Sequence, residues 1–221
     1  MTNSYVGNGV YTYPDLMRIV GITRTRIKGL VDGHVRQDKS RKPIINKRSF
    51  IFENKEYFSF LDLIEIKFIK HFLDQGVPRK NIILAYNKLK EEFKKEHPFA
   101  TKFVADNTNN IFMDNDKDLV SSLDNQVWMR ELAKMDLLEG IDFENELAAR
   151  WYPYKDELPE IVLDPEYNYG MPILKSCNIK TSSIYDAYVA EQGNADVVAD
   201  WFNIPVDLVN QAVKYETRLG I

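Results

Sequence analysis

The chain has 221 residues, of which 44% are hydrophobic and 28% charged, a composition typical of a folded globular protein. Its single cysteine, Cys177, excludes an internal disulfide and a cysteine-based metal cluster, and no apolar run reaches the roughly 18 residues that span a bilayer. The N-terminus lacks the basic start and apolar core of a signal peptide, so we expect a cytoplasmic protein.

The net charge of −4 is divided unevenly along the chain. Residues 1–98 carry 19 Lys and Arg against 11 Asp and Glu, a net charge of +8, whereas residues 99–221 carry 10 against 22, a net charge of −12. Within the basic half, residues 24–48 hold nine Lys and Arg and only two Asp. This asymmetry predicts that the basic half meets a polyanion, although a basic surface without a partner would give the same charges.

The first predicted element is a helix over residues 13–20, with Pro14 at its first turn and apolar residues at helical spacing. Gly21 permits a sharp turn, and Thr23 is a suitable N-cap for a second helix that runs to about Val31. Two short helices joined by a Gly-containing turn are typical of the helix-turn-helix unit.

In a helix-turn-helix the second helix lies in the major groove, and its N-terminal residues lie nearest the base edges. The candidate DNA contacts on this helix are Thr23, Arg24, Thr25, Arg26 and Lys28. The apolar residues Ile22, Ile27 and Leu30 are expected to pack inward. The same pattern also fits the solvated face of an ordinary short helix, and the helix alone does not decide between the two interpretations.

A hairpin is predicted next. Residues 44–52 are β-prone, residues 53–55 are turn-like, and Tyr57 and Phe58 resume the apolar pattern. After a helix-turn-helix, such a hairpin would be a wing. Basic residues along it and before it suit phosphate contacts. They are Arg36, Lys39, Arg41, Lys42, Lys47 and Arg48.

Two long helices follow. Ser59 is a suitable cap for the first, which carries one apolar stripe and ends at Gly76. Pro78 opens the second, with a seam of Ile82, Tyr86, Leu89 and Phe93. We expect these helices to form core and a dimer surface.

The acidic half begins with a predicted hairpin around residues 107–110, a helix near residues 125–135 and a strand over residues 147–154. A further strand is expected from Ile161, followed by a turn at Pro165.

Three short helices are then predicted. Thr181 or Ser182 caps the first, over residues 184–191, Asn194 caps the second, over residues 195–202, and Pro205 opens the third, which runs to about Arg218. The last two could form a second helix-turn-helix shape, but the residues expected on their surface are acidic: Asp196, Asp200 and Asp207. We therefore expect this segment to contact protein or to form core.

No catalytic site is predicted. The histidines His34, His71 and His97 lack zinc-ligand spacing, and each is interpreted as structural or solvated. Nucleotide-binding and nucleophile motifs are absent, and Cys177 has no evident base beside it. Asp114, Asp116 and Asp118 match the first ligand positions of a calcium loop, but Leu119 occupies its glycine position and Asn125 its glutamate position. The sequence therefore predicts no metal and no cofactor.

Two stretches carry a family resemblance. "GVYTYPDLMRIVGITRTRIKGLV" and "FSFLDLIEIKFIKHFLDQGVPRKNI" together resemble the MerR-like winged helix-turn-helix. The C-terminal stretch from "DPEYNYGMPILKS" to "NQAVKYE" resembles a small domain of VapB-like antitoxins. The residues that match that domain are Gly170, Pro172, Ile173, Ile179, Thr181, Ala199, Val209 and Ala212. Where relatives favour Gly-Thr-Arg, this chain has Ser-Cys-Asn at residues 176–178.

The resemblance implies a mainly α fold with small β-hairpins (α+β). Its parts would be a winged helix-turn-helix DNA-binding domain over residues 1–98, a connecting α+β segment over residues 99–160, and a helical antitoxin-type domain over residues 161–221. It also implies an antitoxin of a VapBC-like module, which neutralises a PIN-like ribonuclease toxin and represses its own operon. Such a protein is not an enzyme, and it is expected to form a homodimer or a hetero-oligomer with its toxin.

Two other functions stay open from the residues. The chain could be a MerR-like transcription regulator whose acidic half senses a small ligand. It could also be an enzyme of nucleic-acid processing, for which no residue gives positive support.

Overall fold

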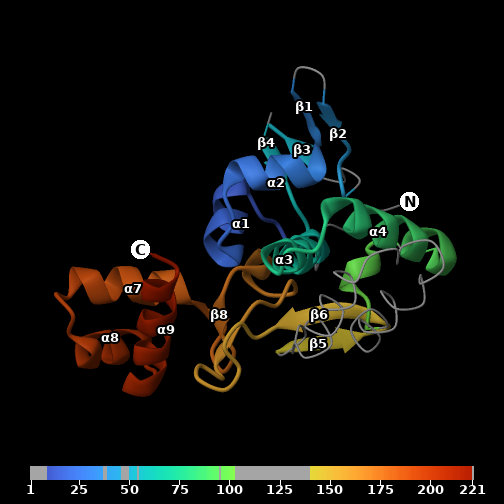
Figure 1. The fold of residues 1–221 in the computed structure, drawn as a ribbon. Coiled ribbons are helices and arrows are strands. Elements are labelled where there is room, and N and C mark those ends of the chain that lie inside the picture. Colours follow the sequence, from blue (N-terminus) through green and yellow to red (C-terminus); the bar gives the residue numbers. More distant parts are fainter. Residues whose placement is uncertain are drawn as a thin grey trace. The chain divides into compact units, whose positions relative to one another are not determined.

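The computed structural model describes residues 9–36, 39–45, 50–53, 55–94, 96–102 and 140–220. The chain divides into two compact units. The N-terminal unit comprises Thr12–Leu138 and Phe143–Ala148, and the C-terminal unit comprises Met1–Tyr11, Glu139–Asp142 and Ala149–Ile221. Helices predominate over small antiparallel sheets (Figure 1), which confirms the expected mainly helical α+β class. None of the described helices is long and apolar enough to cross a membrane.

The N-terminal unit begins with the two predicted short helices. Helix α1 (Tyr13–Val20) begins at a capping box in which the Thr12 side chain accepts from the Asp15 N–H. It ends at Gly21, whose φ of 66° lies in the left-handed region that glycine adopts readily. Helix α2 (Arg24–Val31) begins where Thr23 caps it through the Arg26 N–H. Both predicted helices are confirmed with these bounds.

Two separate hairpins follow α2, where the sequence predicts one. Strand β1 (His34–Arg36) pairs with β2 (Lys39–Arg41), and β3 (Phe50–Phe52) pairs with β4 (Lys55–Tyr57), both antiparallel. The predicted strand over residues 44–52 is wrong in its first part. Ile44 and Ile45 lie in a bend, because both of their N–H groups donate to the Leu30 carbonyl at the end of α2 and both side chains are buried.

The core of the N-terminal unit is built on two longer helices. Helix α3 (Phe60–Asp74) begins at a capping box between Ser59 and Asp62, and α4 (Arg79–Phe93) follows Pro78, as predicted. The short 3₁₀ helix η1 (Pro98–Ala100) then places Phe99 against the rings of Phe72 and Tyr86, with ring centroids 5.8 and 5.3 Å apart. The predicted seam residues Ile82, Tyr86 and Leu89 are buried.

The C-terminal unit places small sheets before three helices. The hairpin of β5 (Ile141–Glu144) and β6 (Leu147–Trp151) has residues in both units, and β6 ends before the predicted Tyr154. Strands β7 (Ile161–Val162), β8 (Ile173–Leu174) and β9 (Ile179–Lys180) form an antiparallel sheet, with the 3₁₀ helix η2 (Asn168–Gly170) between β7 and β8.

Helices α7 (Thr181–Ala190), α8 (Ala195–Phe202) and α9 (Val206–Arg218) close the chain. They pack around a core that includes Ile184, Val198, Val209 and Tyr215.

The caps of these three helices were predicted in part. Asn194 caps α8 and Pro205 precedes α9, as expected. The predicted cap of α7 is wrong, because the N-cap position is Lys180 and no side chain caps it. Thr181 is instead buried, and its hydroxyl is hydrogen-bonded to Glu216 on α9 and to the Pro172 carbonyl. The Thr181 hydroxyl therefore makes tertiary hydrogen bonds and does not cap the helix.

Three predictions lie outside the described residues: the hairpin around residues 107–110, the helix near residues 125–135, and the acidic turn of Asp114, Asp116 and Asp118. The division into three domains with boundaries at residues 98 and 160 stays a prediction.

Candidate nucleic-acid interface

The first turn of α2 presents an exposed polar and basic face. Its members are Thr23, Arg24, Thr25, Arg26 and Lys28, all exposed. The apolar residues between them, Ile22, Ile27 and Leu30, are buried, as predicted. Because the helix has one packed side, its position on the unit is fixed and the basic side chains project from a rigid base.

Arg24 lies against an aromatic support. Its guanidinium carbon lies 4.6 Å from the centroid of the Tyr13 ring, within the range of a cation–π contact. The Tyr13 hydroxyl donates to Glu56 at 2.9 Å, and its pKa is raised by burial first and then by the Glu56 carboxylate. Tyr13 therefore stays neutral at physiological pH and offers Arg24 a flat ring face.

Arg26 is held by the last turn of α3. Its guanidinium donates to Asp74 at 2.8 Å, and Lys70 donates to the same carboxylate at 2.7 Å. These contacts lower the pKa of Asp74, chiefly through the hydrogen bond from Lys70 and also through that from Arg26. An arginine has five N–H donors, and this ion pair uses one of the fork's terminal nitrogens. Arg26 is therefore positioned while its side chain stays 45% exposed.

The other end of α2 is fixed by Arg79 at the start of α4. Its guanidinium donates to the Gly29 carbonyl and, at 2.9 Å, to the Lys42 carbonyl. A cation at the last carbonyls of a helix is favourable for the helix dipole. Sequence reasoning missed this role and that of Asp74, because each partner lies about fifty positions away from α2 and no local pattern joins them.

The remaining predicted DNA contacts are placed only in part. Lys42 is exposed and follows β2. Arg36, Lys39 and Arg41 lie on β1 and β2, whose side chains are not among those that the structure describes. Lys47 and Arg48 lie outside the described residues. The structure thus brings together four candidate residues of α2 and its N-cap Thr23, and Arg79 ties the Lys42 carbonyl to the same helix.

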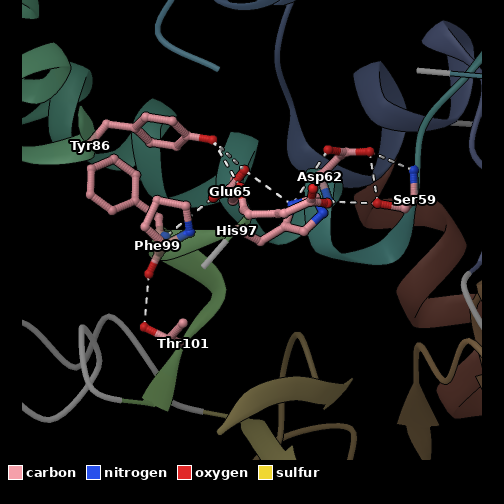
Figure 2. A network of polar contacts seen from close by, with 9 residues as sticks. Ser59, Asp62, Glu65, Tyr86, His97, Phe99 and Thr101 are labelled. Carbon is pink, nitrogen blue, oxygen red and sulfur yellow. Dashed lines mark hydrogen bonds and ion pairs between the residues drawn. The ribbon is translucent and has the colours of Figure 1, made fainter. Parts of the chain in front are cut away.

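A buried polar cluster lies elsewhere in the N-terminal unit, formed by Asp62 and Glu65 of α3 and by His97 before η1. Figure 2 shows the imidazole facing both carboxylates, with Ser59, Tyr86 and Phe99 around them. Nδ1 of His97 lies 3.3 Å from Oε2 of Glu65 and 3.7 Å from Oδ1 of Asp62. Among the described residues these three form the donor set that could hold a metal ion.

The search by histidine and cysteine spacing missed this cluster. Two of its members are carboxylates one helical turn apart, and the third lies 32 positions beyond Glu65. The capping box at Ser59 was the only visible signal, and it marks Asp62 as a helix-start residue rather than a ligand.

The C-terminal helices have a different surface. Asp196, Asp200 and Asp207 are exposed, as predicted, and Trp201 on α8 is 63% exposed. Residues 181–213 contain five acidic residues and no Lys, Arg or His. The next two cations, Lys214 and Arg218, are both paired with Glu157. Cys177 is half-buried against the core of this unit.

Comparisons with known proteins add a fold relationship. No model of a known protein family matches the chain, and no curated protein matches it in sequence. Among solved structures, it is similar to the X-ray crystal structure of Rv2018 from Mycobacterium tuberculosis, with a TM-score of 0.74 and 18% sequence identity. The match covers 92% of this chain and 96% of that chain. At this identity the likeness shows a shared fold.

Proposed function

We propose that the chain is a DNA-binding antitoxin that binds duplex operator DNA, represses its own operon and neutralises a PIN-like ribonuclease toxin. In this proposal the segment from α1 to β4 acts as a winged helix-turn-helix, and helices α7 to α9 act as the antitoxin-type domain. The chain itself is not an enzyme, and the toxin supplies the ribonuclease activity. Pairing with a second copy or with the toxin completes the assembly.

The observation that carries the DNA-binding part is the exposed basic start of α2. Arg24 and Arg26 project from the first turn of a helix whose other side is buried. Each is held by a partner from another element, Tyr13 and Asp74. Arginines held in place before binding lose less side-chain entropy when they meet a base edge or a phosphate. Two arginines in the first turn of α2 are where a recognition helix has its base-contacting residues.

The DNA-binding part is tested by titrating the full chain against the duplex that precedes its own reading frame. A shuffled duplex of the same length and composition serves as the matched control. We expect tighter binding to the upstream duplex, with a slope of log affinity against log salt between about −3 and −6, because each phosphate contact contributes about −0.9. Equal affinity for the two duplexes would contradict sequence-specific binding.

The charge of the C-terminal helices supports a basic partner. All five acidic residues between positions 181 and 213 are at least partly exposed, and Trp201 on α8 is exposed as well. A ribonuclease must bind an RNA polyanion and therefore carries a basic surface. An acidic surface with one exposed aromatic side chain is complementary to such a target in charge, and tryptophan is enriched at the centres of interfaces.

The toxin partner is tested by co-expression with the neighbouring reading frame. We expect the two products to purify as a stable complex. The double variant Asp196→Asn/Asp200→Asn should weaken that complex, and adding Trp201→Ala to it should weaken the complex further. DNA binding should stay unchanged in both variants. The control Asp156→Asn/Glu166→Gln removes two exposed charges outside the helices and should leave the complex intact. If the acidic pair of α8 could be replaced without effect, this face would not be the toxin contact.

A further inference from the structure

We propose that Asp62, Glu65 and His97 bind one divalent first-row transition-metal ion, with Zn²⁺ as the best-suited candidate. The site is separate from the exposed face of α2, and the DNA-binding proposal makes no use of it. It joins the first turns of α3 to the chain segment that follows α4, so a bound ion would cross-link two parts of the N-terminal unit.

Each carboxylate of the cluster accepts hydrogen bonds from outer partners, and one oxygen of each faces the imidazole. Oδ2 of Asp62 accepts from the N–H and the hydroxyl of Ser59, at 2.9 and 2.7 Å. Oε1 of Glu65 accepts from the Phe99 N–H at 3.2 Å. Oδ1 of Asp62 and Oε2 of Glu65 then face Nδ1 of His97 (Figure 2). Metal-binding carboxylates are oriented by outer hydrogen bonds in this way.

The distances within the cluster suit an ion better than a direct ion pair. A charge-assisted N–H···O bond is about 2.7–2.9 Å long. Nδ1 of His97 lies 3.3 Å from Glu65 and 3.7 Å from Asp62, so neither contact reaches that length. Tetrahedral ligands about 2.0–2.1 Å from a zinc ion lie about 3.3 Å from one another. All three ligand atoms lie within 4.8 Å of one another, which makes them a candidate donor set for one ion.

Charge balance favours a divalent cation. The side chains of Asp62, Glu65 and His97 are 5%, 0% and 14% exposed. Two ionised carboxylates with one imidazolium would leave a net negative charge in a buried place, which is costly. A divalent ion with a neutral imidazole neutralises the cluster completely. The Tyr86 hydroxyl also donates to Oε2 of Glu65 at 3.3 Å, and a carboxylate oxygen has a second lone pair for the metal.

The donor types narrow the choice of metal. One imidazole nitrogen and two carboxylate oxygens suit Zn²⁺, Mn²⁺ or Fe²⁺, and the absence of a thiolate disfavours Cu⁺. Three protein ligands leave a fourth position, which a water molecule can fill from the side of His97, the most exposed member of the set.

The site is tested on the full chain, free of any histidine tag, after removal of metal with a chelator. Zn²⁺ is titrated in competition with a chromophoric chelator. We expect one equivalent of Zn²⁺ to bind per chain, and we expect His97→Gln and Glu65→Gln each to weaken binding at least tenfold. The matched control is His71→Gln. This variant removes a half-buried histidine of α3, the helix that carries Asp62 and Glu65, and His71 is not part of the cluster. It should bind Zn²⁺ like the unaltered chain.

A second measurement uses the unaltered chain, so it tests the site even if a variant fails to fold. Co²⁺ added to the unaltered chain should give the visible d–d absorption of a four- or five-coordinate site, and equimolar Zn²⁺ should abolish it. Two results would overturn the proposal: less than about a fifth of an equivalent of Zn²⁺ on the unaltered chain, or a folded His97→Gln variant with undiminished affinity. Neither measurement involves DNA or a toxin, so the metal site and the proposed function can fail separately.

Discussion

Lys67 on α3 shows how one side chain makes stability depend on pH. Its side chain is half-buried, with the ammonium nitrogen 5.4 Å from the centroid of the Phe68 ring, and burial lowers its pKa to about 8. In the unfolded chain the pKa is near 10.5, so the unfolded state binds more protons between these values. The free energy of unfolding contributed by this group therefore rises as the pH increases from about 8 to about 10.5.

Replacing Lys67 with Met keeps the length of the side chain and removes the buried charge. We expect the Lys67→Met variant to be more stable than the unaltered chain at pH 7, by about 1–3 kcal/mol. The difference should shrink above pH 8 and vanish near pH 10.5. Urea denaturation at several pH values measures this, with Lys80→Met, an exposed lysine of α4, as the control. A Lys67→Met chain with unaltered stability at pH 7 would show that burial does not disfavour the charge.

Gly170 is a second residue with a measurable role. Its φ is +81°, and a Cβ at this position would lie 2.2 Å from the Tyr11 hydroxyl, which donates to the Gly170 carbonyl at 2.6 Å. We expect Gly170→Ala to lower the free energy of unfolding by about 3 kcal/mol, through backbone strain and the loss of this buried bond.

Gly193 provides the matched control for Gly170. Its φ is +88°, but the nearest atom to an added Cβ is 3.4 Å away. Gly193→Ala should therefore cost only the left-handed strain of about 1–2 kcal/mol. Equal losses in the two variants, measured by chemical denaturation, would mean that the contact with Tyr11 contributes nothing.

At the scale of single elements, the helices were predictable and the strands were less so. The caps Thr23, Ser59 and Asn194 are local signals, because each side chain bonds to an N–H three positions away. Strands depend on partners elsewhere, and β1 and β2 hold one apolar residue, Val35, among polar and basic ones, without an alternating apolar pattern. Ile44 and Ile45 have high β-propensity, but the carbonyl of Leu30 holds their N–H groups in a bend.

The contact between α2 and α4 leads to a prediction about how the elements hold together. Arg79 donates to carbonyls of Gly29 and Lys42. Hydrogen bonds from a charged group contribute about 1.5–3 kcal/mol, so we expect Arg79→Met to lower the free energy of unfolding by about 2 kcal/mol. The neighbouring exposed Lys80→Met should change it by less than about 0.5 kcal/mol. Thermal or urea denaturation distinguishes the two variants. If Arg79→Met left the free energy of unfolding unchanged, these bonds would not be what holds α2.

At the scale of the whole molecule, the sequence shows charge distribution but not the contacts that organise it. The basic first half and the acidic second half were visible from composition alone. The exposed face of α2 was predicted from helical periodicity, because one helix determines it. The pairing of Arg26 with Asp74 joins residues 48 positions apart, and the cluster at His97 joins α3 to the segment beyond α4. Such contacts depend on the tertiary fold, so no local pattern predicts them.

The central claim, that α2 reads DNA, is tested most directly by the double variant Arg24→Ala/Arg26→Ala in a gel-shift titration against the upstream duplex. Its control is Lys88→Ala/Lys90→Ala, which removes the same charge from α4. Arg24 and Arg26 are exposed, and an exposed ion pair such as Arg26–Asp74 contributes at most about 1 kcal/mol, so the variant should fold. We predict that its affinity falls at least about thirtyfold, as expected for the loss of two specific contacts, while the control binds almost normally. Unchanged affinity of the folded Arg24→Ala/Arg26→Ala chain would contradict the assignment of α2 as the DNA-reading helix.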